Sequence, residues 1–340
     1  MAFPKTRFRR ALIHWYRLHG RDLSWRRTRD PYAILVSEFM LQQTQVATVI
    51  PYYSEWLRRF PDFAVLARTS ENDVLRAWQG LGYYTRARNL HATARAVVDR
   101  RGGHFPRSID RMQKLPGIGK YTAHAIASFA FNQSVPILEA NTARVLARLF
   151  NFRESIDHTA GRKALWKHAA SLVPKRSARF YNSALVDLGA LVCLPRKPKC
   201  TVCPVKEFCR AENPELLPIK KNRPPMMQLT ENHTLITRTD RILLQKADSR
   251  WRGMWILPPL RTRPVNRPPI YKSIFPFTNH RVAFNVYAQR WPKIDNHSQR
   301  WIRIDSLDSI PIATPHRRAM QHLLSDAKAA RSRRQQSSGL

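Results

Sequence analysis

The sequence predicts a mainly α-helical protein in two parts, a larger all-helical part followed by a smaller α+β domain. Apolar residues recur at helical spacing through most of the first 212 residues, with little strand pattern between them. A basic, proline-rich stretch at 213–226 follows, which we predict to be an extended linker. Beyond it, short runs of alternating apolar and polar residues indicate strands.

The charge of the chain points to a polyanionic partner. Lys and Arg total 59 against 23 Asp and Glu, a formal net charge of +36. Nucleic acid is the first partner to expect. A membrane surface is the competing interpretation, but the basic residues are spread along the chain, and no run of about 18 apolar residues is present. Because the N-terminus lacks the apolar core of a secretion signal, we expect a cytoplasmic, nucleoid-associated protein.

The segment 31–44 predicts a buried helix with one carboxylate inside it. Its residues are apolar, apart from Glu38, until the polar end at Gln42, Gln43 and Thr44. A buried carboxylate without a cation has a raised pKa, as a general acid near neutral pH requires. The alternative is a core glutamate satisfied by a backbone or arginine partner. The polar end is either a helix cap or a wedge into stacked bases.

A glycine-punctuated turn follows at 78–84, Trp-Gln-Gly-Leu-Gly-Tyr-Tyr. Its tyrosines are followed by Arg86 and Arg88. Aromatic residues among cations are typical of base stacking combined with phosphate contact. The alternative is that Tyr83 and Tyr84 close a hydrophobic core.

A second glycine turn at 115–121, Leu-Pro-Gly-Ile-Gly-Lys-Tyr, precedes an alanine-rich helix predicted at 121–131. The first turn of that helix presents free backbone N–H groups and a positive dipole end, so an anion such as phosphate fits there. An ordinary turn between two helices is the alternative. The residues expected to contact DNA here are Gly117, Ile118, Gly119 and Lys120.

All four cysteines lie within 17 residues, in the spacing C-x6-C-x2-C-x5-C. So compact a group predicts a metal site rather than disulfides. Structural zinc usually has two C-x2-C pairs, and only one is present, so a [4Fe-4S] cluster is favoured modestly over zinc. The predicted ligands are Cys193, Cys200, Cys203 and Cys209.

The C-terminal part predicts a small α+β domain followed by a disordered basic tail at 326–340. A loop is expected at 251–259, and no sequence signature of a pyrophosphate hydrolase is present. The predicted strands lie at 233–238, 241–245, 282–288 and 301–304, and the predicted helix at 315–324.

Four motifs together resemble a known family. These are Ser37-Glu-Phe-Met-Leu-Gln-Gln-Thr-Gln-Val, Gly80-Leu-Gly-Tyr-Tyr, Leu115-Pro-Gly-Ile-Gly-Lys-Tyr-Thr-Ala and the cysteine spacing. They resemble the MutY-type adenine DNA glycosylases of the helix-hairpin-helix superfamily. The resemblance runs from about residue 7 to 218 and weakens afterwards, where the family carries a Nudix-like domain that recognises 8-oxoguanine and lacks hydrolase activity.

The resemblance implies a domain layout. A helical DNA glycosylase domain is expected at 1–212, with a six-helix lobe at roughly 27–135 and an iron-sulfur lobe formed by 1–26 and 136–212. The linker at 213–226 then leads into a Nudix-like domain at 227–325.

The resemblance also implies a chemistry, removal of adenine mispaired with 8-oxoguanine after the adenine has been flipped out of the duplex. Glu38 matches the glutamate that protonates N7 of the adenine. Glu139 matches the second carboxylate, which stabilises or attacks the sugar so that water replaces the base with retention. The family has aspartate there, so this side chain is one methylene longer. Asn141 matches the asparagine beside that carboxylate.

Tyr121 matches the position at which strand-cleaving relatives carry a lysine nucleophile. Lys120 is one residue too early to replace that lysine, because it points about 100° away on a helix. The resemblance therefore implies a monofunctional glycosylase without Schiff-base lyase chemistry.

Further matches concern base recognition. Trp25 and Arg26 match the Trp-Arg pair of the adenine pocket. Ser183 falls in that pocket where the family has Gln or Glu facing the adenine edge, and it is too short to reach the base as they do. Gln43 and Tyr83 match residues that wedge the duplex open.

The lesion-reading Phe-Ser-His loop of the family aligns with Thr278, Asn279 and His280. Only the histidine is kept, so we expect altered but retained recognition. A loop that no longer reads the lesion is the alternative.

The leading hypothesis is thus a monomeric, [4Fe-4S]-containing adenine DNA glycosylase that binds double-stranded DNA with an adenine:8-oxoguanine mispair. A mismatch glycosylase for another base, such as thymine opposite guanine, is a second hypothesis. A lesion-binding protein with little catalysis is a third.

Overall fold

The computed structural model describes residues 3–221, 224–260, 267–289 and 298–337, with side chains up to residue 325. Contacts divide the chain into two compact units, each of which is described by itself. The helical unit comprises 1–68 and 89–222, and the second unit comprises 69–88 and 223–340. In the described parts of the chain, no helix has the length and apolar run needed to cross a membrane.

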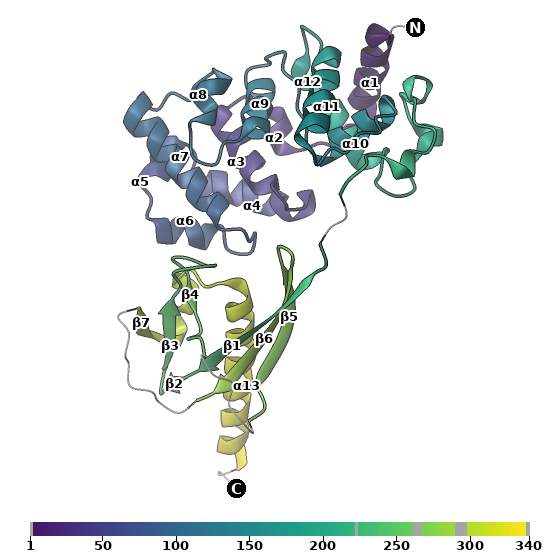
Figure 1. Ribbon diagram of the computed structural model, residues 1–340. Coiled ribbons are helices and arrows are strands. Elements are labelled where there is room, and N and C mark those ends of the chain that lie inside the picture. The colour runs from purple at the N-terminus through teal and green to yellow at the C-terminus, as the bar shows by residue number, and fades with distance from the viewer. Residues whose placement is uncertain (1–2, 222–223, 261–266, 290–297, 338–340) are drawn as a thin grey trace. The chain divides into compact units, whose positions relative to one another are not determined.

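The first part of the chain is all-helical, as predicted. Over 3–221 the described residues form α-helices and short 3-10 turns but no strand. Figure 1 shows α1, α10, α11 and α12 grouped together within the helical unit. The helices are α1 Lys5–His19, α2 Ser24–Arg27, α3 Pro31–Leu41, α4 Val46–Arg59, α5 Phe63–Arg68, α6 Glu71–Ala77, α7 Thr85–Arg101, α8 Ile109–Gln113, α9 Lys120–Phe129, α10 Ala140–Leu149, α11 Thr159–Leu172 and α12 Ala178–Leu191.

Helix α3 is buried on all sides, as its sequence predicts. Asp30 caps it by accepting hydrogen bonds from the backbone amides of Tyr32 and Ala33, and Pro31 occupies the first turn. Because α3 packs against both α4 and α9, its apolar residues are covered all round. The helix therefore holds Glu38 in a largely apolar environment.

The predicted glycine turn at 115–121, called the hairpin below, connects α8 Ile109–Gln113 to α9 Lys120–Phe129. Gly117 has a φ of +73°, a left-handed conformation that glycine adopts without strain. The hydroxyl of Thr93 donates to the carbonyl of Pro116 at 2.8 Å, which ties the turn to α7. Gly119 occupies the N-cap of α9 without a side-chain cap, so the amides of the first turn face outward from the hairpin.

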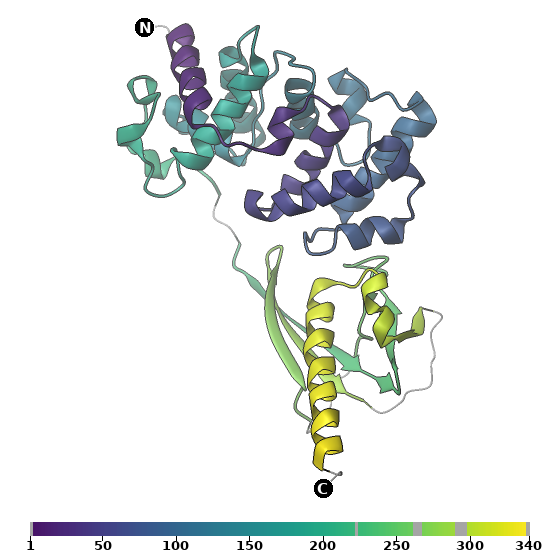
Figure 2. The same ribbon diagram turned by 180° about the vertical axis from the view of Figure 1, so that it is seen from behind.

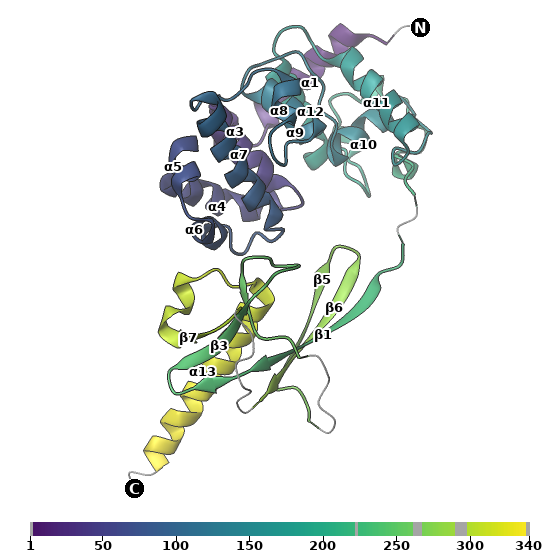
Figure 3. The same ribbon diagram turned by 60° about the vertical axis from the view of Figure 1, so that its left-hand side comes forward.

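The C-terminal part is an α+β domain with two small sheets. In one sheet β6 lies between β1 and β5, parallel to β1 and antiparallel to β5. In the other, β3 pairs antiparallel with β2, β4 and β7. Figure 3 shows the turn at the tip of the β5–β6 hairpin. The strands are β1 Met227–Leu235, β2 Thr237–Arg238, β3 Arg241–Lys246, β4 Trp255–Ile256, β5 Tyr271–Phe277, β6 His280–Ala288 and β7 Gln299–Arg303.

Helix α13, Thr314–Ser337, covers one face of the β1-β6-β5 sheet (Figure 2). Its Ala319 and Met320 share a buried core with Phe284 and Val286 of β6. The disordered tail predicted from residue 326 is wrong over 326–337, which continue α13. The reason is that strong helix formers follow one another there, with no glycine or proline. Residues 338–340 lie outside the described part.

Two strands, β4 and β5, were not predicted from the sequence. β5 contains Pro276, which argues against a strand in sequence, yet β5 pairs with β6 alone in the described sheet and so tolerates it. Within the predicted loop at 251–259, Trp255 and Ile256 form the short β4.

Residues 69–88 group with the C-terminal part, although the predicted six-helix lobe included them. Three side chains carry this grouping. Arg76 donates to the carbonyl of Ser309 at 3.3 Å, and Gln79 accepts from the amide of Ile312 at 3.3 Å. The hydroxyl of Tyr84 lies 3.3 Å from that of Thr314.

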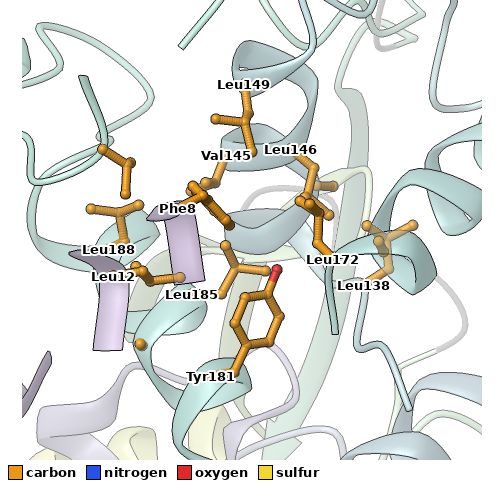
Figure 4. Close-up of a cluster of buried hydrophobic side chains, with 14 of the residues drawn as sticks. Phe8, Leu12, Leu138, Val145, Leu146, Leu149, Leu172, Tyr181, Leu185 and Leu188 are labelled. Atoms are coloured by element: carbon orange, nitrogen blue, oxygen red, sulfur yellow. The ribbon is translucent and has the colours of Figure 1, made fainter. Parts of the chain in front are cut away.

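The hydrophobic core formed by α1, α10, α11 and α12 supports the site described below. Phe8 and Leu12, one turn apart on α1, are fully buried against α10 and α12. Figure 4 shows these side chains converging. Phe208, from the cysteine-containing loop, belongs to the same core. This packing fixes α10 and α12, which both contribute to the pocket.

The hairpin yields a matched pair of stability predictions. A Cβ atom at Gly117 would lie 2.6 Å from Cβ of Asn89, at a positive φ, whereas one at Gly119 would meet no atom within 4 Å. We expect Gly117→Ser to lower the free energy of unfolding by about 1–3 kcal/mol. Gly119→Ser, which adds a favourable N-cap, should cost less than about 0.5 kcal/mol. Urea unfolding measures both, and equal losses would contradict the assignment of strain to Gly117.

Candidate active site

A pocket of about 550 Å³ lies within the helical unit. Segments far apart in sequence line it, from α2, α3, α9, α10 and α12. It brings together most of the residues predicted for catalysis and for the adenine pocket. The predicted residues that line it are Trp25, Arg26, Glu38, Gln42, Gln43, Thr44, Tyr121, Glu139 and Asn141.

Glu38 is the buried acid of this pocket. Only 6% of the residue is exposed. Burial raises the pKa of the Glu38 carboxyl to about 7, and the hydrogen bond to the Tyr121 hydroxyl and the nearby charge of Arg26 partly offset this. At neutral pH a large fraction of Glu38 therefore carries a proton that it can donate into the pocket.

Glu139 is held at the N-cap of α10. Its carboxylate accepts from the backbone amides of Asn141 at 2.8 Å and Thr142 at 2.9 Å, and its own amide donates to the Thr142 hydroxyl at 2.8 Å. Burial raises the pKa of Glu139, and the two amides and Arg144 oppose that shift. The extra methylene is thus accommodated by a reciprocal cap that fixes the carboxylate.

Asn141 lies beside this carboxylate and is held from two sides. Its side-chain oxygen accepts from Arg144 at 2.8 Å. Arg144 also donates to the carbonyls of Gly189 and Cys193. A Cβ atom at Gly189 would lie 2.7 Å from Cβ of Asn141, so only glycine permits this approach of α12 to α10.

The structure separates the neighbours Tyr121 and Lys120. Tyr121 points into the pocket, and burial raises its pKa well above the ordinary value, helped by the adjacent charge of Glu38. The Lys120 ammonium instead lies 4.3 Å from the ring centroid of Trp166. A lysine amine is therefore absent from the described lining of the pocket.

A network of charges behind the pocket was missed by sequence reasoning. Asp187 of α12 is fully buried and accepts from the backbone amide of Arg21 at 2.9 Å and from its guanidinium at 2.6 Å. It also accepts from Arg26 at 3.3 Å, and the Arg26 guanidinium lies over the rings of Tyr16 and Phe129. The sequence did contain a signal for Asp187. Like Glu38 in α3, it is a single acid within an otherwise apolar helical run, which indicates a buried carboxylate.

Ser183 was predicted to face the adenine, but it does not line the pocket. It is 2% exposed. Arg179, one turn earlier on α12, lines the pocket together with Val186. The Ser183 side chain is too short to pass beyond these neighbours. Arg179 also donates to the carbonyls of Arg26 and Thr28, which fixes the segment that carries Trp25.

The polar end of α3 and the hairpin carry most of the residues predicted to contact DNA. Gln42 is the C-cap of α3, and Gln43 has a φ of +57°. In the hairpin Gly117 and Gly119 are exposed, whereas the side chain of Ile118 is buried, so Ile118 offers only its backbone.

Tyr83 and Arg86 belong to the second unit. Tyr83, which was predicted to wedge the duplex open, is 42% exposed. Arg86 was expected to contact DNA, but its side chain is 7% exposed and donates inward to the carbonyls of Leu81 and Gly82. Burial lowers its pKa to about 10.

The predicted lesion-reading residues occupy the turn between β5 and β6. Thr278 and Asn279 are exposed, and Thr278 has a φ of +52°. His280 begins β6 opposite Phe277. The Arg250 guanidinium lies 4.4 Å from the ring centroid of Phe277, which secures the base of the turn.

The four thiols share one loop against the helical core. Burial raises the pKa of Cys203 to about 11, and the negative charges of the other three thiols add to the shift. Within the described residues, no three potential ligands lie at the spacing of a bound ion. Arg148 of α10 donates to the Cys193 sulfur at 3.3 Å and to the Leu194 carbonyl at 2.7 Å. Deprotonating all four sulfurs at this spacing is unfavourable by itself, and a positively charged iron-sulfur core would stabilise the thiolates as its ligands.

Comparison with known proteins decides the family. Residues 36–171 match a model described as the HhH-GPD superfamily base excision DNA repair protein. An adenine DNA glycosylase of Buchnera aphidicola subsp. Baizongia pistaciae is 42% identical over 253 residues, covering 73% of this chain and 71% of the relative. The chain belongs to the adenine DNA glycosylase family. The predicted MutY-type membership is thereby confirmed, and with it a DNA N-glycosylase of the adenine-specific kind.

Other members of the adenine DNA glycosylase family differ in length. The human protein is 46% identical over 215 residues, covering 61% of this chain and 39% of its own length. The chain thus spans about two-fifths of that relative. The protein of Buchnera aphidicola subsp. Acyrthosiphon pisum is 29% identical over 339 residues, covering 93% of this chain and 97% of the relative.

Two solved structures share the helical fold. A thermostable thymine-DNA glycosylase is 33% identical, with a TM-score of 0.56, and covers 61% of this chain and 95% of its own. An endonuclease III bound to DNA has a TM-score of 0.52 at 22% identity, covers 62% of this chain and 96% of its own, and shares the fold alone.

The cofactor prediction is also confirmed. Residues 193–209 match a model described as the iron-sulfur binding domain of endonuclease III. The loop therefore holds a [4Fe-4S] cluster on Cys193, Cys200, Cys203 and Cys209.

The raised pKa of Glu38 predicts how stability depends on pH. The folded state binds this proton more tightly than the unfolded state, so its contribution to stability is lost as pH rises from 4.5 through about 7. We expect Glu38→Gln to be more stable than wild type above pH 7, with the difference shrinking towards pH 4.5. Denaturant unfolding at several pH values measures this.

The control for this experiment is the exposed Glu207, which pairs with Arg7 on the surface. Glu207→Gln should produce no such pH-dependent gain. A gain in Glu38→Gln that is the same at every pH would contradict the assignment.

Proposed function

We propose that this glycosylase hydrolyses the N-glycosidic bond of adenine mispaired with 8-oxoguanine or guanine in DNA and leaves the strand uncut. The observation that carries the proposal is the buried Glu38, with a pKa of about 7, in the same pocket as a second carboxylate. A protonated carboxyl group can protonate N7 of a flipped adenine and turn the base into a leaving group. Membership in the adenine-specific family supports the identity of the base.

Glu139 is proposed to face the sugar. As the glycosidic bond breaks, positive charge develops on the sugar, and a carboxylate in a water-poor pocket stabilises it or attacks it. Water then replaces the base on the same side, with retention. The two backbone amides that hold Glu139 keep its carboxylate in one place during these steps.

We propose that the enzyme does not cleave the DNA strand, because of the residue at position 121 and the direction of the Lys120 side chain. A Schiff base needs a lysine amine at the sugar. Tyr121 instead hydrogen-bonds Glu38, and Lys120 lies over the ring of Trp166.

Recognition of 8-oxoguanine is assigned to the C-terminal domain, which we propose is Nudix-like. The exposed turn at Thr278 and Asn279, followed by His280, presents hydroxyl, amide and imidazole groups that can pair with polar base edges. We propose that the protein acts as a monomer.

Single-turnover excision tests the function. Duplexes carry adenine opposite 8-oxoguanine, adenine opposite guanine, or thymine opposite guanine. We expect adenine release opposite 8-oxoguanine to be fastest and to fall about 100- to 10,000-fold in Glu38→Gln. Preferred release of thymine would support the second hypothesis, and tight binding without release would support a lesion-binding protein.

The pH profile of the same reaction is a separate prediction. Because Glu38 must carry its proton, the excision rate should fall about tenfold per pH unit above about pH 7. Measuring single-turnover rates from about pH 6 to about pH 9 checks this, with the control Glu207→Gln keeping the profile of the wild type. A rate that rises with pH would contradict general acid catalysis by Glu38.

Glu139→Asp tests whether the pocket is built around glutamate. The shorter side chain keeps a carboxylate and an N-cap but withdraws the charge by about one methylene, so we expect excision to slow about 10- to 100-fold. Single-turnover rates of wild type, Glu139→Asp and Glu139→Gln make the comparison. A faster Glu139→Asp enzyme would show that the natural residue is compromised.

A further inference from the structure

The turn between α6 and α7 has an unusual backbone. Gly80, Gly82 and Tyr83 all have positive φ, of 106°, 70° and 48°. Glycine adopts such values readily, but a tyrosine does so only when its surroundings hold it there. The result is an exposed aromatic ring at the tip of the turn.

Arg86, in the first turn of α7, holds this backbone in place. One of its terminal nitrogens, Nη2, donates to the carbonyls of Leu81 at 2.9 Å and Gly82 at 3.0 Å. The indole nitrogen of Trp78 donates to the same Gly82 carbonyl at 3.1 Å. Trp78 at the start of the turn and Arg86 just after it therefore both donate hydrogen bonds to carbonyls of the turn.

The same guanidinium supports the ring of Tyr83. Its carbon atom lies 5.6 Å from the Tyr83 ring centroid and 5.3 Å from that of Trp78. A planar guanidinium can stack on two rings while its N–H groups donate in plane, which a lysine ammonium cannot do. Because the same guanidinium binds the turn carbonyls and contacts the Tyr83 ring, Arg86 holds that ring in a fixed orientation relative to the turn backbone.

We propose that Arg86 is a positioning residue that sets Tyr83 as a rigid wedge before DNA is bound. The proposal rests on the proposed function, because a wedge matters only if a base must be flipped from the duplex. A wedge ordered in advance loses less conformational freedom on binding, so it opens the base pair faster. Arg86 acts through Tyr83 and is not itself required to touch the DNA.

The experiment separates opening of the duplex from chemistry. The variants are Arg86→Gln, Arg86→Lys and, as a control, Arg100→Gln, an exposed arginine in the last turn of the same helix. One substrate is a full duplex with adenine opposite 8-oxoguanine. The other keeps both bases within a short unpaired bubble, in which no wedge is needed.

We expect Arg86→Gln and Arg86→Lys to slow single-turnover excision from the duplex about tenfold or more and from the bubble less than about threefold, since only the duplex must be opened. The control should match wild type on both. Equal slowing on both substrates would overturn the proposal in favour of a purely structural role. If wild type excises adenine from neither substrate, the proposed function fails instead.

A second readout does not depend on excision. In a Glu38→Gln background, 2-aminopurine beside the mispair reports unstacking on binding, and we expect a slower fluorescence rise when Arg86→Gln is added. An unchanged rise would overturn the proposal. Affinity is also measured against salt. If Arg86 contacted a phosphate, the salt dependence would weaken by about one charge in Arg86→Gln, which would contradict a purely internal role.

Discussion

Burial of the Glu38 carboxyl group is the constraint on which the site depends. Helix α3 is buried on all sides because it packs against α4 and α9, and among the described residues the groups that act on the Glu38 charge are Tyr121, Arg26 and Glu139. Removal from water raises its pKa, which makes the group an acid at neutral pH. Tyr121 of α9 and Arg26 of α2 partly offset that shift, so both helices contribute to the acidity of one carboxyl group.

The second carboxylate depends on α10 and on what holds that helix. Glu139 caps the helix, and within it Arg144 and Arg148 donate to carbonyls of the cysteine loop. Phe208 of that loop lies in the core that also contains α1 and α12. The iron-sulfur loop is therefore part of the support of α10, and the position of Glu139 depends on contacts at the far end of its own helix.

The helical fold and Glu38 could be predicted from sequence, because an apolar run with one acid is a local pattern. Asp187 has the same pattern, but its partner Arg21 lies 166 positions away and only the fold reveals the pair. Ser183 was misplaced because helix rotation and side-chain length decide which residues of α12 reach the pocket. Arg86 looked like a phosphate contact, since sequence does not show which way a basic side chain turns. Pro276 concealed β5 for a related reason, because edge position is a property of the sheet.

Three arginines and three acids lie in the pocket and directly behind it, and their summed charge changes during the proposed reaction. Arg21, Arg26 and Arg179 line the pocket with Glu139 and Glu38, and Arg21 and Arg26 also donate to Asp187 behind it. With Glu38 protonated, the formal charges of these six groups sum to +1. Once Glu38 has given its proton to the departing base, the six groups cancel. The cationic sugar proposed for the reaction would then form in surroundings that have become one charge unit more negative. That change stabilises the positive charge of the sugar as it develops.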